Sequence, residues 1–417
     1  MSRCRKGARS MVSGLALLAL LCAGNAGAKD YRKLYAFRGE GDGGEPRGAL
    51  AQDSDGNLYG TTSIDGLHDR CFQGCGTVFK LAPDGTFSVL YAFRGIEDGD
   101  GGAPQSGLIL DRKGNLYGTT GGGGDNPSCP SGCGTVYRLA PDGTETILYS
   151  FAGGTGDGAG PLAGLVRDRD GNLYGTTVVG GGAGCDSYGC GTVFRLSKGG
   201  KETLLHVFTG GADGDWPTAG SLIRDHGGNL YGTTSAGGNT GCNGNGCGVV
   251  YKLSASGEET VLHAFTGSDG SDPLGLAADG DGNLYGTTQG GGIGCDPTGC
   301  GTVFRIAANG DFSVLYAFAG GSAGRLPFAA PTVNRRGIVY GVTAGGGKHE
   351  SGMVFRLALD GSLKVLRAFR YDGLDGLDPA APLILTADGT IYGTTLFGGG
   401  ATGDCFSGCG TVFTLRK

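Results

Sequence analysis

The sequence contains six closely spaced cysteine pairs, and two thiols at such spacing can either form a disulfide or help to hold a metal ion. The pairs are Cys71 with Cys75, Cys129 with Cys133, Cys185 with Cys190, Cys242 with Cys247, Cys295 with Cys300, and Cys405 with Cys409. A zinc site would need four ligands from two neighbouring pairs, and no histidine accompanies the pairs. We therefore favour six disulfides, each closing a small loop that adds about 2 kcal/mol by an entropy estimate.

A second set of candidate functional residues consists of six aspartates, each four residues before a proline. They are Asp42, Asp100, Asp157, Asp213, Asp269 and Asp375. A ring of such carboxylates could attract a cation or a hydroxyl-rich ligand, and calcium is the cation to consider, although it takes six to eight oxygens. Each Asp-Gly could instead form a turn in which the side chain accepts backbone N–H groups. We favour the turn, because a requirement repeated along the chain is better explained by backbone geometry, and we predict no cofactor.

Trp216 is the single tryptophan and stands within "DGDWP", where it breaks the pattern of the related loops. A tryptophan in a loop can stack on a sugar or anchor a partner, and it can also pack against its own loop. The sequence leaves both interpretations open.

The stretch "DSDGNLYGTT", Asp53 to Thr62, first suggests a calcium loop because acidic residues alternate before a glycine. Its third acid, Asp55, becomes Lys113 and Arg336 in related stretches, and a metal ligand would not change in this way. No catalytic motif such as GxSxG or HExxH is present. Carboxylate pairs for glycoside hydrolysis depend on three-dimensional spacing, so the sequence leaves them open.

The elements that must position these residues form a repeat. "GNLYGTT" begins at Gly56, Gly114, Gly171, Gly228 and Gly282, and weaker copies begin at Gly337 and Gly389. Each period contains four short apolar segments separated by turn signals, and helical periodicity is absent. The links between the first and second segments and between the third and fourth are tight turns. The other two links are long and must emerge on the opposite face.

The order of the segments predicts how the fold closes. The chain opens with a lone fourth segment, "KLYAF" at Lys33 to Phe37, and ends with a first, second and third segment that lack a fourth. A ring in which the N-terminal strand completes the last blade satisfies both edges. We therefore predict an all-β fold, a seven-bladed β-propeller of four-stranded blades, as a single domain over residues 29–417.

Residues 1–28 have the features of a secretory signal peptide. Four basic residues precede an apolar run from Leu15 to Leu21, and small residues follow at Ala26 to Ala28. Removing the four basic residues from a chain of formal net charge −6 leaves −10. We expect an exported protein, periplasmic or extracellular, without a membrane span, monomeric, and without the basic stripe that nucleic-acid binding requires.

The repeat, with "GNLYGTT" followed by a glycine-rich loop and "GCGTVFKL" or "GCGTVFRL", resembles the GloVer (Gloeobacter/Verrucomicrobia) tandem repeat family of exported bacterial proteins. It is similar, more distantly, to regulator-type β-propeller repeats with a "GNLWxGT" signature. The resemblance covers essentially the whole mature chain. It implies an extracellular or envelope location and supplies no catalytic residues.

Two functions are consistent with these features. The first is a non-catalytic exported propeller that binds a glycan or a protein partner, or serves as an envelope scaffold, through the face formed by the long loops. The alternative is a lyase or hydrolase with a metal-assisted site at the channel mouth on the same face. The enzyme hypothesis predicts asymmetry, with a histidine and several acids brought together in one or two blades.

Overall fold

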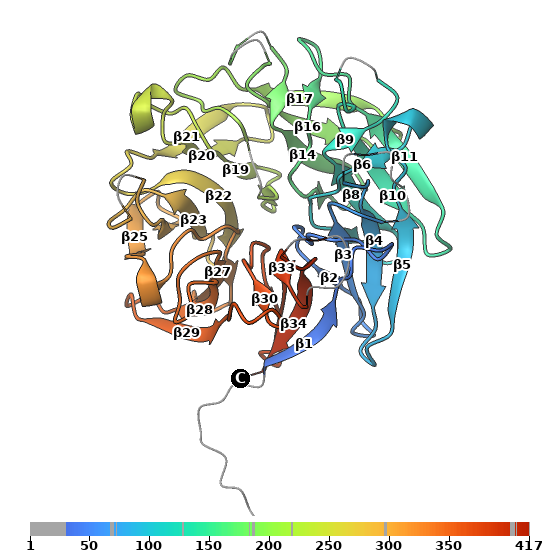
Figure 1. The fold of residues 1–417 in the computed structure, drawn as a ribbon. Helices are drawn as coiled ribbons and strands as arrows, with labels where there is room; N and C mark the ends of the chain where they lie inside the picture. Colours follow the sequence, from blue (N-terminus) through green and yellow to red (C-terminus); the bar gives the residue numbers. More distant parts are fainter. Residues whose placement is uncertain are drawn as a thin grey trace, which may run out of the picture.

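The computed structural model describes residues 31–416, apart from residues 67–70, 72, 127–128, 183, 186–187, 218–219, 296–297, 401–404 and 406. The predicted signal peptide, residues 1–28, lies outside the described residues. The described chain forms seven antiparallel sheets of four strands, arranged as the blades of a ring (Figure 1). Its helical segments are three short 3-10 turns: η1 (Ile96–Asp98), η2 (Cys242–Gly244) and η3 (Gly321–Ala323). The predicted seven-bladed β-propeller is confirmed.

The blades are numbered along the chain, and each runs from its inner to its outer strand. Blade 1 contains β2 (Ala51–Gln52), β3 (Leu58–Thr62), β4 (Thr77–Leu81) and β5 (Phe87–Ala92). Blade 2 contains β7 (Ile109–Leu110), β8 (Leu116–Thr120), β10 (Thr135–Leu139) and β11 (Glu145–Ser150). Blade 3 contains β13 (Val166–Arg167), β14 (Leu173–Thr177), β16 (Thr192–Leu196) and β17 (Glu202–Val207). Blade 4 contains β18 (Ile223–Arg224), β19 (Leu230–Thr234), β20 (Val249–Leu253) and β21 (Glu259–Ala264).

The remaining blades follow the same order. Blade 5 contains β22 (Ser271–Ala278), β23 (Leu284–Gly290), β24 (Thr302–Ile306) and β25 (Phe312–Ala317). Blade 6 contains β26 (Thr332–Val333), β27 (Val339–Thr343), β28 (Met353–Leu357) and β29 (Leu363–Ala368). Blade 7 contains β31 (Ile384–Leu385), β32 (Ile391–Thr395), β34 (Thr411–Leu415) and β1 (Tyr31–Ala36). Three two-stranded ribbons pair β6 (Gly101–Gly102) with β9 (Gly122–Gly123), β12 (Gly158–Ala159) with β15 (Val179–Gly180), and β30 (Gly376–Leu377) with β33 (Phe397–Gly398).

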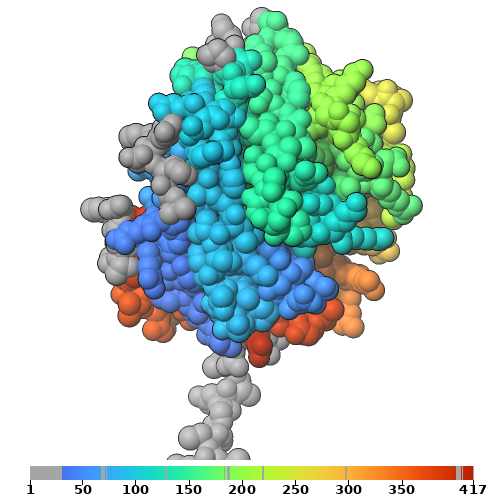
Figure 2. Space-filling view, turned by 90° about the vertical axis from the view of Figure 1, so that its right-hand side faces the viewer, coloured from blue at the N-terminus to red at the C-terminus, as the bar shows by residue number. Residues whose placement is uncertain are grey.

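The ring closes through the N-terminal strand, as the segment order predicted. β1 pairs antiparallel with β34, from Tyr31 opposite Leu415 to Ala36 opposite Thr411, so the last sheet has the order β1-β34-β32-β31. The first and last strands lie side by side in Figure 1. Seen from the side, neighbouring blades pack against one another as one continuous body (Figure 2).

The repeated GNLYGTT stretch forms the first hairpin and the second strand of each blade. In blade 1 the hairpin glycine Gly56 has a φ of 83°, which glycine adopts without strain. The carboxylate of Asp53 accepts hydrogen bonds from the Asn57 backbone N–H at 2.9 Å, the Asn57 amide at 2.7 Å and the Tyr59 hydroxyl at 2.9 Å. Blades 2 to 5 repeat this Asp–Asn–Tyr clamp, with Asp111, Asp168, Asp225 and Asp279 as acceptors. Although burial opposes ionisation, the bonds from Asn57 and Tyr59 hold the pKa of Asp53 below its ordinary value.

The second glycine of the same stretch makes room for the aromatic core between blades. A Cβ on Gly60 would lie 2.5 Å from the ring of Phe79 on β4. Phe79 packs edge to face on Phe37, which follows β1 in the neighbouring blade, with ring centroids 5.2 Å apart. The same contact recurs in Phe93–Tyr137, Phe151–Phe194, Phe208–Tyr251, Phe265–Phe304, Phe318–Phe355 and Phe369–Phe413. Because burying one such ring contributes roughly 2 to 3 kcal/mol, these pairs hold adjacent blades together.

No helix in the described part of the chain is long and apolar enough to cross a lipid bilayer.

Candidate functional site

The long links between the second and third strands, and those between consecutive blades, lie on one side of the ring, which we call the long-loop face. All six predicted disulfides form on this face: Cys71–Cys75, Cys129–Cys133, Cys185–Cys190, Cys242–Cys247, Cys295–Cys300 and Cys405–Cys409. Disulfides persist in oxidising compartments, so they indicate a non-cytoplasmic protein.

Each disulfide packs against a glycine in the link that leaves the same blade. A Cβ on Gly95 would lie 2.7 Å from Cys71 Sγ, and one on Gly210 would lie 2.6 Å from Cys185 Sγ. Blade 6 has no cysteine pair, and there the matching residue is Tyr371, which is 79% exposed. The disulfide and its glycine are therefore absent together, and in five of the six disulfide-bearing blades a Cβ at this position would crowd a sulfur atom.

Each inter-blade link contains a proline at the same position of the repeat. The residue before this proline has a left-handed backbone, with positive φ, in all seven blades. These rim residues, with their φ angles, are Glu45 (52°), Ala103 (52°), Gly160 (64°), Trp216 (54°), Asp272 (55°), Leu326 (55°) and Asp378 (52°). The backbone N–H of Glu45 donates to the Cys409 carbonyl at 2.9 Å, and the other six donate to Cys75, Cys133, Cys190, Cys247, Cys300 and Ser351 of the preceding blade. The backbone of the rim is constant, while its side chains differ from blade to blade.

The residues that follow these prolines line the mouth of the central channel, where a cavity of about 260 Å³ opens. Among the lining residues are Arg47, Gln105, Leu162, Leu274, Phe328 and Ala380. Arg47 is the one charged residue in the described lining, and its guanidinium donates to the Glu45 carboxylate at 2.6 and 3.2 Å. Blades 1 and 2 thus give the mouth a polar side, and blades 3, 5, 6 and 7 give it an apolar side.

A second hollow, of about 700 Å³, adjoins the mouth over blades 1 and 2. It shares Arg47 and Gln105 with the channel cavity and extends past Glu45 and Ala103 to the loop of the Cys71–Cys75 disulfide. The two spaces therefore meet at Arg47 and Gln105.

The six aspartates predicted as candidate binding residues do not line the channel cavity. The carboxylate of Asp42 accepts the Tyr35 hydroxyl at 2.7 Å and the Arg38 and Gly39 backbone N–H groups at 3.0 Å each. Asp100, Asp157 and Asp375 likewise bond the backbone of their own loops. These contacts place the carboxylates at the outer strands, where they order the start of each inter-blade link.

Two of the six aspartates pair with histidines that take the place of an outer-strand tyrosine. His263 Nε2 lies 2.9 Å from Asp269, and His206 Nε2 lies 3.4 Å from Asp213. Burial opposes ionisation of Asp269, yet bonds from Thr266 and His263 hold its pKa below the ordinary value. Each histidine therefore continues the structural role of the tyrosines.

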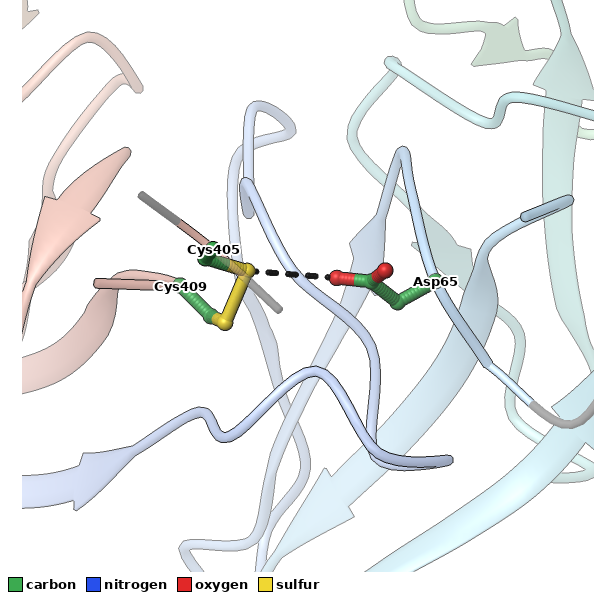
Figure 3. A group of neighbouring side chains, drawn as sticks. All are labelled: Asp65, Cys405 and Cys409. Carbon is green, nitrogen blue, oxygen red and sulfur yellow. Dashed lines mark hydrogen bonds between the residues drawn. A yellow bond between two sulfur atoms is a disulfide. The ribbon is translucent and has the colours of Figure 1, made fainter. Parts of the chain in front are cut away.

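Groups of three potential metal ligands occur at two places in the described chain, and both contain a disulfide. One is Asp65 with Cys405 and Cys409, shown in Figure 3, where an Asp65 oxygen lies 3.3 Å from Cys405 Sγ. A disulfide sulfur carries no proton, so this is a contact rather than a hydrogen bond donated by the cysteine. The other group is Cys185, Cys190 and Asp215. Neither group offers the six to eight oxygens that calcium takes.

Trp216 is 49% exposed, and the disulfide loop that its backbone contacts carries a second exposed aromatic residue, which the sequence did not single out. Tyr188 is 74% exposed and lies within the Cys185–Cys190 loop, whose Cys190 carbonyl accepts the Trp216 N–H at 3.1 Å. Two accessible rings therefore flank one disulfide on the long-loop face. Tyr188 could have been found as one of three aromatic residues enclosed by a cysteine pair, the others being Phe72 and Phe406.

Asp272 is a second residue that the sequence analysis missed. This rim residue is partly buried, and its burial raises its pKa to about 6. Burial also raises the pKa of Asp378, and Arg325 opposes that change. The signal in the sequence was positional, because both acids stand directly before the proline of their links.

The fold and these loops define a seven-bladed β-propeller whose long-loop face is braced by disulfides. The chain belongs to the Gloeobacter/Verrucomicrobia repeat family, whose model matches residues 21–185, 126–333 and 296–417. The resemblance seen in the sequence is thus confirmed. No protein of curated function matches the chain.

Solved structures of other propellers are similar in fold. A gluconolactonase from Xanthomonas campestris is 15% identical, with a TM-score of 0.43, over 93% of this chain and 89% of its own. A luciferin-regenerating enzyme is 12% identical, with a TM-score of 0.43, over 94% of this chain and 96% of its own. Similarity at this level concerns the fold and carries no activity to this chain.

Proposed function

We propose that this protein is an exported, non-catalytic β-propeller that binds a glycan on its long-loop face. The observation that carries the proposal is the rim, where one backbone conformation recurs seven times with different side chains. A non-glycine residue with a left-handed backbone costs about 1 kcal/mol relative to glycine. Stability alone would favour glycine at every rim position, yet six of the seven have a side chain. We infer that these side chains are retained for binding.

The exposed aromatic pair supports a glycan as the ligand. Trp216 and Tyr188 present accessible rings beside one disulfide loop, and aromatic faces stack on the apolar faces of sugars. The rim acids Asp272 and Asp378 and the polar side of the channel mouth supply acceptors and donors for hydroxyl groups. Because the disulfides brace the loops, little ordering would be needed on binding.

The test is a glycan array probed with the mature chain, followed by titration calorimetry on the oligosaccharides retained. We expect W216A/Y188A to lose this binding, while Y371A retains it. Tyr371 is an even more accessible aromatic on the same face, in the blade without a disulfide, so it controls for general loss of aromatic surface. An array without bound glycans, or equal loss in the two variants, would contradict the proposal.

A second candidate function, a hydrolase or lyase, is favoured by Asp272. A carboxyl group with a pKa near 6 can both donate and accept a proton near neutral pH, as a general acid–base requires. If the protein is such an enzyme, D272N should abolish turnover of lactone or glycoside substrates that the wild-type chain accepts. Turnover unchanged in D272N would remove this candidate.

A further inference from the structure

The face opposite the long loops carries a hollow between blades 6 and 7. Its volume is about 810 Å³, and its lining includes Arg335, Arg336 and Arg356 but no acidic residue among those described. The charge of this lining is opposite in sign to that of the whole chain, which has a formal net charge of −6. The hollow is a local concentration of positive charge on an acidic protein.

The arginines of the hollow have no clamp carboxylate beside them, because blade 6 lacks the Asp–Asn–Tyr clamp. Asn334 takes the place of the clamp aspartate and keeps the turn, since its side chain accepts the backbone N–H groups of Arg336 at 2.9 Å and Ile338 at 3.1 Å. Ile338 takes the place of the clamp asparagine. The turn geometry is preserved, while the carboxylate found in blades 1 to 5 is absent from blade 6.

Loss of the clamp also changes the surroundings of Arg356. In blade 5 the equivalent residue, Arg305, donates to the side-chain oxygen of Asn283 at 2.8 Å. Ile338 offers Arg356 no such acceptor. Within the described chain none of the three guanidinium groups that line the hollow has an ion pair or a side-chain hydrogen bond.

Two acids lie close in sequence to the hollow, and both have other partners. The carboxylate of Asp388 accepts hydrogen bonds from Thr386 and Thr390. Asp360 accepts two from Ser362, which lower its pKa, with a smaller contribution from Arg356. The guanidinium groups therefore remain available to a ligand.

We propose that this hollow binds a phosphoryl group carried by a larger molecule. A phosphoryl group presents several charged oxygens that match the forked N–H donors of arginine and can engage more than one guanidinium. The hollow is much larger than a single anion, and Val333, Ile338 and Leu385 provide partly buried apolar surface between the charges. The site thus fits the phosphoryl group together with the carbon skeleton that bears it.

Blade 2 provides a matched control within the same molecule. It has Arg112 and Lys113 at the turn positions of Arg335 and Arg336, but it retains the clamp, with Asp111 accepting bonds from Asn115 and Tyr117. Blade 2 therefore carries the same turn charges with a carboxylate beside them. A site that depends on the lost clamp should be affected by changes in blade 6 and not in blade 2.

The experiment uses two probes on the mature chain: inorganic pyrophosphate by titration calorimetry, and phosphatidylglycerol vesicles by co-sedimentation. We expect R335Q/R336Q to weaken binding by at least about tenfold, as loss of charge-assisted hydrogen bonds implies, and R112Q/K113Q to leave it unchanged. N334D/I338N, which restores the clamp without removing an arginine, should also weaken binding. Thermal unfolding of each variant verifies the fold.

The two probes distinguish the sources of the phosphoryl group. Binding of pyrophosphate alone assigns a soluble phosphorylated ligand, and binding of vesicles alone assigns a lipid headgroup. Binding of neither probe, or equal weakening by the blade 6 and blade 2 variants, would overturn the proposal. Since the hollow lies opposite the long-loop face, the outcome of this phosphoryl-binding experiment is independent of the outcome of the glycan experiment.

Discussion

Replacing Asp272 with asparagine should stabilise the protein, and the effect should depend on pH. Burial raises the pKa of this carboxyl group from 3.8 to about 6, so the folded state disfavours its ionised form. The destabilisation is absent below pH 4, where the group is protonated in both states. It grows as the pH rises from about 4 to 6 and is complete above pH 6.

The magnitude follows from the size of the pKa change. A change of about two pKa units, at about 1.4 kcal/mol per unit, corresponds to roughly 3 kcal/mol. We therefore expect D272N to raise the free energy of unfolding by up to about 3 kcal/mol at pH 8 and by much less at pH 4. Asparagine also tolerates the left-handed backbone of this position, an advantage that is independent of pH.

The measurement is urea unfolding of both proteins at pH 4, 6 and 8, followed by circular dichroism. D281N is the control, because Asp281 is an exposed aspartate in the hairpin of the same blade and its replacement should change little at any pH. A stabilisation by D272N that is equal at pH 4 and pH 8, or absent at pH 8, would refute the electrostatic reasoning.

Two further predictions concern the scaffold. G60A should destabilise the fold by about 1 to 3 kcal/mol, because the new Cβ would overlap the Phe79 ring. G280A is the control in the same urea titration and should be nearly neutral, because open space surrounds Gly280. Removing one disulfide with C129S/C133S should lower the free energy of unfolding by about 2 kcal/mol in oxidising buffer. Wild-type protein treated with a dithiol should lose more unfolding free energy, because all six disulfides open. An unchanged urea midpoint of unfolding in either case would contradict a stabilising role for the disulfides.

Much of the fold could be predicted because each period repeats the same order of apolar strand segments and turn residues. The positive-φ glycine of each hairpin and the order of the segments specify how many blades there are and how they close. The cysteine spacing also predicted the disulfides, since partners four or five residues apart need no knowledge of tertiary structure. The two interpretations of Trp216 stayed open in the sequence, because exposure depends on the neighbouring loop.

The candidate site was harder to predict because repetition draws attention to residues that bond the backbone of their own loops. The six repeated aspartates are prominent in the sequence, but the structure places each on the backbone of its own loop. The rim residues vary between copies, so an alignment of the repeats shows no pattern at their position. Only the tertiary structure shows their shared left-handed backbone.

The sequence by itself determined the blade count, the closure by the N-terminal strand and the disulfide pairing, because all three depend on local turns and on the order of segments along the chain. Only the tertiary structure decided which side chains meet at the channel mouth and that three arginines line a hollow without an acidic partner there. Those contacts join residues of different blades, and their distances are set by the packing of aromatic pairs between the blades.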